Sequence, residues 1–514
     1  MDSAELHRQL LDPTVYPDKP ATVTFRETHI SRVYLTDHFA YKLKKPLNLG
    51  FLDFSTLPKR RFFCNEELAL NRRFAPDIYI EVLAVRCAAN RVKLSGRGQI
   101  IDYAVRMRRL PEERMLSHLL DETDPDLPLA MERLAEHLAI LLGQSVPCPK
   151  EETVETVREK LAGNLRQTVP AIGLTLSTEA HALMTACIDR ELRRLSLLIE
   201  QRSADGYVRD GHGDLHAANI CMTEPITVYD CIEFCRRFRV ADVAADLAFL
   251  LMDLDFRNRR DLAGIFLASY QHQASDPGLV SLLPLYKTYR AWVRGKVATL
   301  LAMESDVEAD HRRQALDEGR RYFNLALGYQ LQPTLFLTAG EMGVGKSTLA
   351  RALAAATGAS MLRSDVVRKE LAGLPADRPS PDPFASGLYT AEMNARTYAA
   401  LLARAEVLLK RGGSVIVDAA FTDTDERTAF LALAARLDRK ALFLRLSCPP
   451  ATALARLDRR RQLSNDPSDG RRELYARHAA SFSEFTPWIP VLEIDSSLAV
   501  DYNVQHVLCT ILQP

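Results

Sequence analysis

The chain has 514 residues, which suggests three compact units at about 150 residues each. Hydrophobic residues make up 47% and charged residues 26%, which is the balance of a globular protein and not of a disordered one. The 66 Lys and Arg match 66 Asp and Glu, and this neutral balance argues against a dedicated nucleic-acid coat or a polybasic membrane binder.

The cysteines and the apolar stretches indicate a cytoplasmic protein. The nine cysteines include no CxxC pair, and an odd number does not suit a closed disulfide framework, so we expect reduced thiols. The first 13 residues are polar and acidic, unlike a signal peptide. The most apolar stretch, residues 240–255, is interrupted by Asp246 and Asp253, so we expect no membrane span.

The N-terminal part predicts a small α+β unit that ends near residue 110. Residues 22–44 alternate apolar and polar side chains around a turn at 36–38, as antiparallel hairpin strands do. The pattern then predicts a helix over 58–74 and strands over 79–85 and 102–110.

Residues 111–329 are mainly helical in pattern, with two interruptions that predict short strands and loops. The first contains HGDLHAANI, in which Asp214 and Asn219 have the spacing of the protein-kinase catalytic loop. The second contains VYDCIEF, in which Asp230 ends an apolar run. Asp246, together with Asp242, is expected to begin the next helix and brace the catalytic loop.

These residue types suit phosphoryl transfer from ATP. One carboxylate must orient the acceptor hydroxyl and take its proton, which is the role predicted for Asp214. An amide oxygen and a second carboxylate must hold Mg²⁺ against the ATP phosphates, and Asn219 and Asp230 are the predicted ligands.

The string HGDLHxxN followed by an Asp-bearing strand resembles the aminoglycoside phosphotransferase and choline-kinase-like family. The resemblance covers most of residues 22–330 and implies a bilobal protein-kinase-like fold, with a small lobe over 1–110 and a large lobe over 111–330. The chain departs from protein kinases because RETHIS, at 26–31, occupies the place of their Gly-rich loop. This departure argues against a protein kinase.

The same resemblance implies contacts with ATP in the small lobe. In the string FAYK, Lys42 is the candidate for the α- and β-phosphates, with Lys44 on the same strand face as the alternative. Glu67 is expected to pair with this lysine, and the neighbouring Glu66 is nearly as good. Met107 falls at the expected hinge that holds adenine.

A new pattern begins near residue 331 and predicts a three-layer α/β domain over 331–514. Helical segments separate five short apolar runs, an alternation typical of a parallel sheet with right-handed crossovers. The expected strands are 334–340, 360–365, 414–421, 441–449 and 491–497.

The first of these strands leads into GEMGVGKST, a complete phosphate-loop motif between a strand and a helix. Lys346 is expected to reach the β- and γ-phosphates, while the Ser347 hydroxyl ligates Mg²⁺. Asp418, at the end of a later strand, is the candidate second carboxylate for Mg²⁺. The predicted nucleotide-binding residues are Gly340, Gly343, Gly345, Lys346, Ser347 and Thr348.

The string LRSDVVR resembles the polynucleotide-kinase-like and small-molecule-kinase branch of P-loop kinases. The resemblance implies that Asp365 is the base for the acceptor hydroxyl and that Arg368 clamps the acceptor. An arginine-rich segment falls where such kinases place a mobile lid, and its candidates for neutralising the transferred phosphoryl group are Arg456, Arg459, Arg460 and Arg461.

The whole chain resembles bacterial bifunctional proteins that join an aminoglycoside-phosphotransferase-like domain to an ATP-binding P-loop domain. The resemblance implies two kinases that use ATP or GTP and Mg²⁺ to phosphorylate hydroxyls of small molecules, such as a sugar, an amino sugar, an aminoglycoside or a nucleoside-like compound. One alternative is a polynucleotide 5′-kinase in the C-terminal domain with a regulatory kinase-like domain, although nucleic acid is the less favoured partner. Another is an ATP-sensing module without catalysis. The sequence does not identify either acceptor or the oligomeric state.

Overall fold

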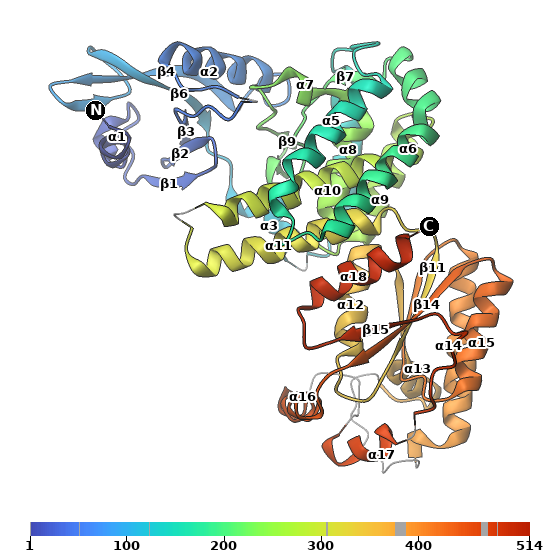
Figure 1. Cartoon of the computed structure of the whole chain (residues 1–514). Coiled ribbons are helices and arrows are strands. Elements are labelled where there is room, and N and C mark those ends of the chain that lie inside the picture. Colours follow the sequence, from blue (N-terminus) through green and yellow to red (C-terminus); the bar gives the residue numbers. More distant parts are fainter. Residues whose placement is uncertain are drawn as a thin grey trace. The chain divides into compact units, whose positions relative to one another are not determined.

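The computed structural model describes residues 2–50, 52–122, 124–304, 307–375, 387–463, 471–480 and 482–513 (Figure 1). The chain divides into two compact units: unit 1 comprises Met1–Glu159 and Arg194–Tyr286, and unit 2 comprises Lys160–Arg193 and Lys287–Pro514. Unit 2 therefore begins before residue 331, where the sequence places the start of the P-loop domain. The start of the P-loop domain at residue 331 stays a prediction.

Unit 1 begins with a six-stranded antiparallel sheet in the order β1-β2-β3-β6-β4-β5. The predicted hairpin is confirmed, because Leu35 pairs with Ala40 and the Thr36 N–H donates to the Phe39 carbonyl at 2.8 Å. The turn between β1 and β2, at residues 28–30, falls within RETHIS, the segment predicted to occupy the place of the Gly-rich loop of protein kinases. The strands are β1 (Thr24–Glu27), β2 (Ser31–Leu35), β3 (Phe39–Lys44), β4 (Tyr79–Ala88), β5 (Arg91–Lys93) and β6 (Gln99–Arg108).

Alternation along these strands gives the sheet two apolar faces. On one face Tyr41 and Ala104 form a core with Leu10 of α1 (Ser3–Leu10). On the other, Ala40 and Val105 pack with Cys64 of α2 (Leu57–Asn71), which is the predicted helix. The sequence pattern did not predict α1 or β5, because α1 buries a single residue and β5 is three residues long.

The rest of unit 1 is mainly helical, as predicted. Helix α8 is buried from Val243 to Asp255, so its carboxylates must find partners inside the protein. Short antiparallel pairs form between β7 and β10 and between β8 and β9. The elements are α3 (Leu116–Leu119), α4 (Leu127–Gln144), β7 (Val208–Asp210), β8 (Ile220–Cys221), β9 (Thr227–Val228), α7 (Arg236–Arg239), β10 (Val240–Asp242), α8 (Val243–Phe256) and α9 (Arg260–Gln273).

Unit 2 contains a five-stranded parallel sheet in the order β12-β13-β11-β14-β15, with helices on both faces (Figure 1). All five predicted strands are present, so the predicted α/β class is confirmed. The strands are β11 (Thr334–Ala339), β12 (Ser360–Arg363), β13 (Val415–Asp418), β14 (Lys440–Ser447) and β15 (Val491–Asp495). The helices that follow them are α12 (Lys346–Thr357), α13 (Ser364–Leu371), α14 (Ala391–Lys410), α15 (Thr424–Arg436), α16 (Pro450–Leu463), α17 (Tyr475–Ala479) and α18 (Val500–Leu512).

Helix α11 (Ala309–Gly328) packs in unit 2 against α12 and α18. A Cβ on Gly328 would lie 2.0 Å from the Ala356 carbonyl oxygen, so the end of α11 approaches the backbone of α12 very closely. The Asn324 amide donates to the Asp501 carbonyl at 2.8 Å. The helical layer beside the phosphate-loop helix therefore includes a helix that precedes the P-loop motif. Residues of both units contribute to α5 (Val154–Gln167), α6 (Thr178–Ala204) and α10 (Leu279–Met303).

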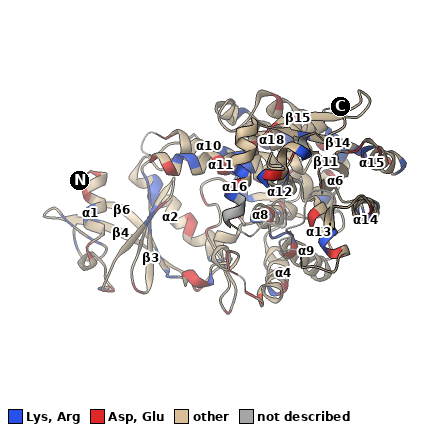
Figure 2. Cartoon of the chain, turned by 90° about the horizontal axis from the view of Figure 1, so that it is seen from below, with Lys and Arg blue, Asp and Glu red and all other residues tan. Residues whose placement is uncertain are grey.

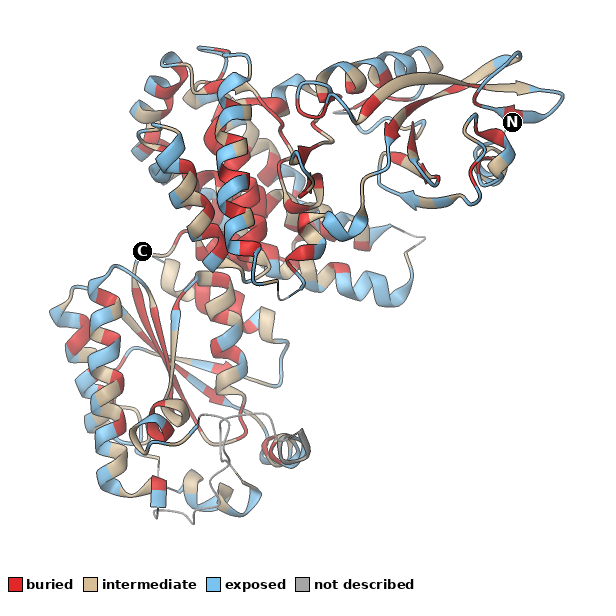
Figure 3. Ribbon diagram, turned by 180° about the vertical axis from the view of Figure 1, so that it is seen from behind, coloured by how far each residue is buried: buried red, intermediate tan, exposed pale blue. Residues whose placement is uncertain are grey.

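Burial is concentrated in the central strands of the parallel sheet and in the inner helices of the helical part (Figure 3). Lys and Arg are interspersed with Asp and Glu along the elements, in keeping with the zero net charge (Figure 2). The nine cysteines are all free, as predicted. Within the described ranges, no helix has both the length and the apolar character needed to cross a bilayer.

Candidate phosphotransfer sites

The catalytic loop of unit 1 follows β7 and is held by carboxylates of α8. Asp246 accepts the backbone N–H groups of His212 and Gly213, each at 2.8 Å, which confirms its predicted bracing role. Asp253, which sequence reasoning missed, accepts the Ala217 N–H at 2.9 Å. Its seven-residue spacing from Asp246, two helical turns, was the available signal.

Asp242 begins the helix, as predicted, but within the described residues its side chain has no hydrogen bond to the catalytic loop. It caps α8 by accepting the Ala244 N–H at 2.8 Å, and it pairs with Arg202 at 2.8 Å. It therefore fixes the start of the helix that carries Asp246, rather than contacting the loop itself.

His212 links this loop to the strand that precedes Asp230. Its Nδ1 accepts the Asp214 N–H at 3.2 Å, so the proton is on Nε2, which donates to the Tyr229 carbonyl at 2.9 Å. Burial lowers the pKa of His212, although Asp246 and Asp214 oppose this effect. A neutral histidine thus joins the two segments that carry the predicted catalytic residues.

The structure brings Asp214 and Asn219 together. The Asn219 amide donates to the Asp214 carbonyl at 2.9 Å and to its carboxylate at 3.2 Å. Because the NH₂ group faces Asp214, the Oδ1 atom of Asn219 is the one offered to a metal. The Asp214 side chain is 38% exposed, and His216 Nε2 lies 3.5 Å from its carboxylate. An acceptor hydroxyl can therefore approach this carboxylate from solvent.

Two lysines of β3 converge on one glutamate of α2. Lys42 Nζ lies 2.8 Å from Glu67 Oε1 and 2.5 Å from Asp230 Oδ1. Lys44 Nζ lies 2.7 Å from Glu67 Oε2 and also bonds Glu233. Glu67, not Glu66, is the glutamate placed against the lysines, and sequence reasoning missed Glu233.

Electrostatics favour the charged forms of Glu67 and Lys42 in this buried cluster, whereas burial raises the pKa of Glu233. Burial alone would raise the pKa of Glu67, but Lys42 and Lys44 together hold it below its usual value. Burial likewise opposes charge on Lys42, yet Asp230 and Glu67 raise its pKa well above the ordinary value. At neutral pH a charged Lys42 therefore lies beside the predicted metal ligand.

Met107 lies on β6 opposite Ala40 and packs in an apolar cluster with Val33 and Tyr229. This cluster lies on the sheet face that packs against α2. Its hinge role stays a prediction.

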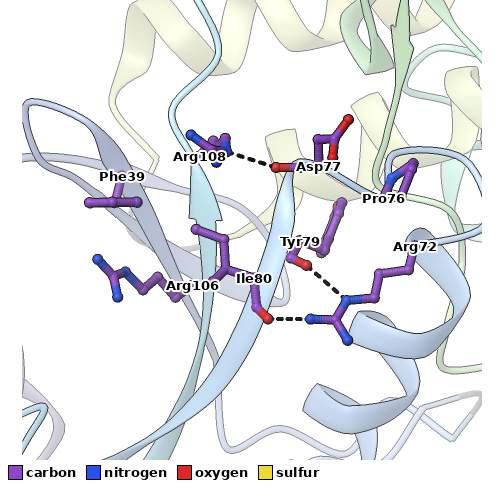
Figure 4. Close-up of a pocket in the computed structure, with 8 residues that line it drawn as sticks. All are labelled: Phe39, Arg72, Pro76, Asp77, Tyr79, Ile80, Arg106 and Arg108. Carbon is purple, nitrogen blue, oxygen red and sulfur yellow. Dashed lines mark hydrogen bonds between the residues drawn. The ribbon is translucent and has the colours of Figure 1, made fainter.

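Arg106 and Arg108, which flank Met107 on β6, line a different hollow of about 410 Å³. Its other lining residues are Phe39, Arg72, Pro76, Asp77, Tyr79 and Ile80 (Figure 4). The Arg72 guanidinium donates to the Tyr79 carbonyl at 2.9 Å, and Arg108 donates to the Asp77 carbonyl at 3.0 Å. These arginines bind the protein's own backbone, and none of the predicted site residues lines this hollow.

In unit 2 the glycines of the phosphate loop adopt positive φ angles, which favour glycine over other residues. Gly340, Gly343 and Gly345 have φ of +131°, +81° and +99°. A Cβ at Gly340 would lie 2.5 Å from the Leu446 carbonyl oxygen, so no larger residue fits there. Lys346, the first residue of α12, donates to the carbonyls of Gly340 at 2.8 Å and Glu341 at 2.7 Å.

Ser347 and Asp418 meet around an arginine at the carboxyl ends of the strands. Arg363 lies 3.3 Å from the Asp418 carboxylate and donates to the Ser347 hydroxyl at 3.5 Å. Burial raises the pKa of Asp418, while the Ser347 hydroxyl and Lys346 lower it. Arg363 belongs to the string LRSDVVR, but no role was predicted for it from the sequence.

The predicted acceptor pair of unit 2 is also formed. Arg368 donates to Asp365 at 3.0 Å and to Asn394 at 3.1 Å, and its guanidinium lies 4.7 Å from the centre of the Tyr389 ring. Burial and Lys346 lower the pKa of His478 of α17 to about 4, while Asp365 opposes this shift.

One of the arginines predicted to belong to a lid contacts the phosphate loop. Arg456 donates to the Val344 carbonyl at 3.3 Å and to the Ser496 carbonyl at 2.8 Å. Tyr475 of α17 donates to the Glu341 carboxylate. Arg459 is exposed, and the side chains of Arg460 and Arg461 lie outside the described residues. Which arginine acts on a phosphoryl group stays a prediction.

Residues 335–485 match the family model AAA_33, described as an AAA domain. Over 465 residues the chain is 30% identical to Rv2004c, an uncharacterized protein of Mycobacterium tuberculosis (strain H37Rv), which covers 89% of this chain and 90% of the relative. A choline/ethanolamine kinase family protein from Mesorhizobium loti is 14% identical with a TM-score of 0.41, over 69% of this chain and 99% of that one. A gluconokinase from Sinorhizobium meliloti 1021 is 17% identical with a TM-score of 0.27, over 35% and 91%.

Proposed function

We propose that this chain, which belongs to the family of the mycobacterial protein Rv2004c, is an ATP- and Mg²⁺-dependent bifunctional phosphotransferase. Each unit would transfer the γ-phosphoryl group of a nucleotide to a hydroxyl of a small molecule. One observation carries the proposal: unit 1 pairs Lys42 with Asp230 and Asn219 with Asp214, while unit 2 holds Lys346 in its phosphate loop, Ser347 and Asp418 around Arg363, and Asp365 against Arg368.

In unit 1 the acceptor oxygen attacks the γ-phosphorus, the bond to the β–γ bridging oxygen breaks, and ADP leaves. Asp214 takes the hydroxyl proton, and its exposed carboxylate supports this role. Lys42 binds the α- and β-phosphates. Asn219 Oδ1 and Asp230 would hold Mg²⁺, which neutralises charge on the phosphates when bound.

In unit 2 the same transfer uses another set of groups. Asp365 takes the acceptor proton and Arg368, fixed by Asn394, clamps the acceptor. Lys346 leaves the loop carbonyls for the β- and γ-phosphates. Ser347 and Asp418 would hold Mg²⁺ or its water.

The donor set fits Mg²⁺ bound together with a nucleotide. Among the described residues, no group of three or more His, Cys, Asp or Glu side chains could hold a metal ion by itself. Mg²⁺ is usually bound through one or two carboxylates plus substrate phosphates, not by an all-protein cage. The paired ligands Asn219 with Asp230, and Ser347 with Asp418, agree with that arrangement.

The test is ATP turnover by the full chain on a panel of acceptors, with products identified by mass. The panel holds sugars, sugar acids, amino sugars, aminoglycosides, amino alcohols, nucleosides and 5′-hydroxyl oligonucleotides. Wild type is compared with Asp214→Asn and Lys346→Ala. We expect two products, each lost in one variant only.

Other results would contradict the proposal. A product that survives both substitutions would arise outside these sites. If Asp214→Asn changes no product, unit 1 is a sensor or a scaffold and the chain is not bifunctional. If the only product of unit 2 is a 5′-phosphorylated oligonucleotide, its acceptor is a nucleic acid and not a small molecule.

A further inference from the structure

The two lysines of β3 have unequal surroundings. The side chain of Lys44 is fully buried, and its partners Glu67 and Glu233 are 0% and 4% exposed. Lys42 shares Glu67, but its second partner, Asp230, is 39% exposed. A ligand can therefore reach the Lys42 end of the cluster, whereas Lys44 is enclosed by protein.

The segment from Asp230 to Glu233 is fastened to α2 at two points one helical turn apart. Asn71 accepts the Cys231 N–H at 2.8 Å. Glu67, four residues earlier on the same helix, reaches Glu233 through Lys44. Asp230 itself has φ of +65°, a left-handed backbone that a non-glycine residue keeps only when its surroundings hold it.

The balance of charges in this cluster allows Asp230 to leave Lys42. The cluster holds two lysines and three carboxylates, a net charge of −1 when all are ionised. If Asp230 turns to a cation, Lys42 still has Glu67 and Lys44 still has Glu233. No buried charge then loses its last partner, so the metal ligand can be released from Lys42 at little cost.

We infer that Lys44 and Glu233, with Asn71, form a brace that positions Asp230 for its metal, and that Lys42 alone serves the nucleotide phosphates. This inference rests on the proposed function of unit 1. Lys44 and Glu233 are positioning residues, because they act through Glu67 and Asp230 and touch neither nucleotide nor acceptor.

The test measures ATP affinity of the full chain with excess Mg²⁺ and with EDTA, in a Lys346→Ala background that silences the phosphate loop. The ratio of the two affinities is the gain due to metal. Glu233→Gln and Lys44→Met are expected to lower this ratio about tenfold or more, as loss of a supporting contact to a metal ligand does, with the metal-free affinity kept within about twofold. Lys42→Met is expected to weaken both affinities.

Two further variants separate positioning from stability. The double variant Lys44→Met with Glu233→Met replaces a buried ion pair by apolar side chains, a change that is often neutral for stability. We expect it to melt near wild type and still to lose the metal-dependent gain. The exposed pair Arg133 and Glu224, 3.3 Å apart, gives the matched control, and Arg133→Met should change neither affinity.

Three results would overturn the inference, each for a different reason. If the double variant keeps the full metal-dependent gain, the pair is only structural. If Lys44→Met weakens metal-free ATP binding as much as Lys42→Met does, Lys44 is the phosphate lysine. If the Lys346→Ala chain binds no ATP at all, the proposed function of unit 1 fails and the inference fails with it.

Discussion

The two lysines proposed to bind phosphate are held in opposite ways. Lys346 donates to two backbone carbonyls five and six residues before it, within its own loop. Lys42 is held by carboxylates of Glu67, on a separate helix, and of Asp230, 188 residues away. One site is built from local backbone geometry, and the other from charges that only the folded unit brings together.

This difference predicts which change damages which site. Glycines and a strand–helix connection maintain the loop around Lys346, so backbone strain should break it. Opposite charges in a buried space maintain the cluster around Lys42, so removal of one charge should break it. The following substitutions test this contrast, beginning with the largest expected effect.

Glu67→Ala should destabilise unit 1, because it removes two buried ion pairs at once, those of Glu67 with Lys42 and with Lys44, and leaves the lysines with Asp230 and Glu233 only. Breaking buried ion pairs costs up to about 3–5 kcal/mol. The midpoint of urea unfolding, followed by a probe in unit 1, measures the loss. Glu66→Ala is the matched control on the same helix and should change stability by less than about 0.5 kcal/mol. Equal losses from both substitutions would show that Glu67 has no special role.

Lys42→Met and Lys346→Ala should each remove the product of one site only. Loss of an electrostatic contact to the transferring group reduces the rate by about 10²–10³. The acceptor panel measures both products in both variants. A fall in both products with either variant would mean that the two sites do not work independently.

Gly343→Ala should destabilise unit 2 more than Gly373→Ala. Both glycines have a left-handed φ, +81° and +68°, so each alanine costs about 1–2 kcal/mol of backbone energy. Only at Gly343 does the new Cβ also lie 2.7 Å from a backbone oxygen, that of Ala453. Overpacking adds about 1–3 kcal/mol there. Equal melting temperatures of the two variants would contradict a tightly closed phosphate loop.

The same contrast explains how far the sequence predicts the structure. The phosphate loop is encoded within nine consecutive residues, so strand, loop, helix and Lys346 could all be placed from the sequence. The choice between Lys42 and Lys44 stayed open because both lie on one face of one strand. Glu233 and Asp253 were missed because their roles depend on Lys44 and on the Ala217 N–H, which approach them only in the folded unit.

Fold class was predictable because periodicity is a local property. The five strands of unit 2 and the hairpin of unit 1 follow from alternation and from runs of apolar residues. The packing of α11 against α12 and α18 was not predictable, because the amphipathic pattern of a helix shows which face is buried but not which element packs against that face. Helix α1 was missed because it carries one buried residue, Leu10.

The smallest expected effect is a pH dependence confined to unit 2. Burial and the neighbouring Asp423 raise the pKa of Glu426 to about 7 against the opposing effects of Tyr398 and Arg368, whereas Lys42 and Lys44 hold the pKa of Glu67 below its usual value. A raised pKa means that the folded state keeps the proton while the unfolded state, near 4.5, loses it, so this contribution to stability is lost as the pH rises from 4.5 through 7.

Glu426→Gln should therefore gain melting temperature relative to wild type as the pH rises from about 5 to 8. Glu406→Gln is the matched control, because Arg436 and Lys410 lower the pKa of Glu406 to about 2. Its contribution changes only below 4.5, so its difference from wild type should stay constant over the same range. A difference for Glu426→Gln that is equally flat would mean that Glu426 ionises normally and that the carboxylates of the two units are held in the same way.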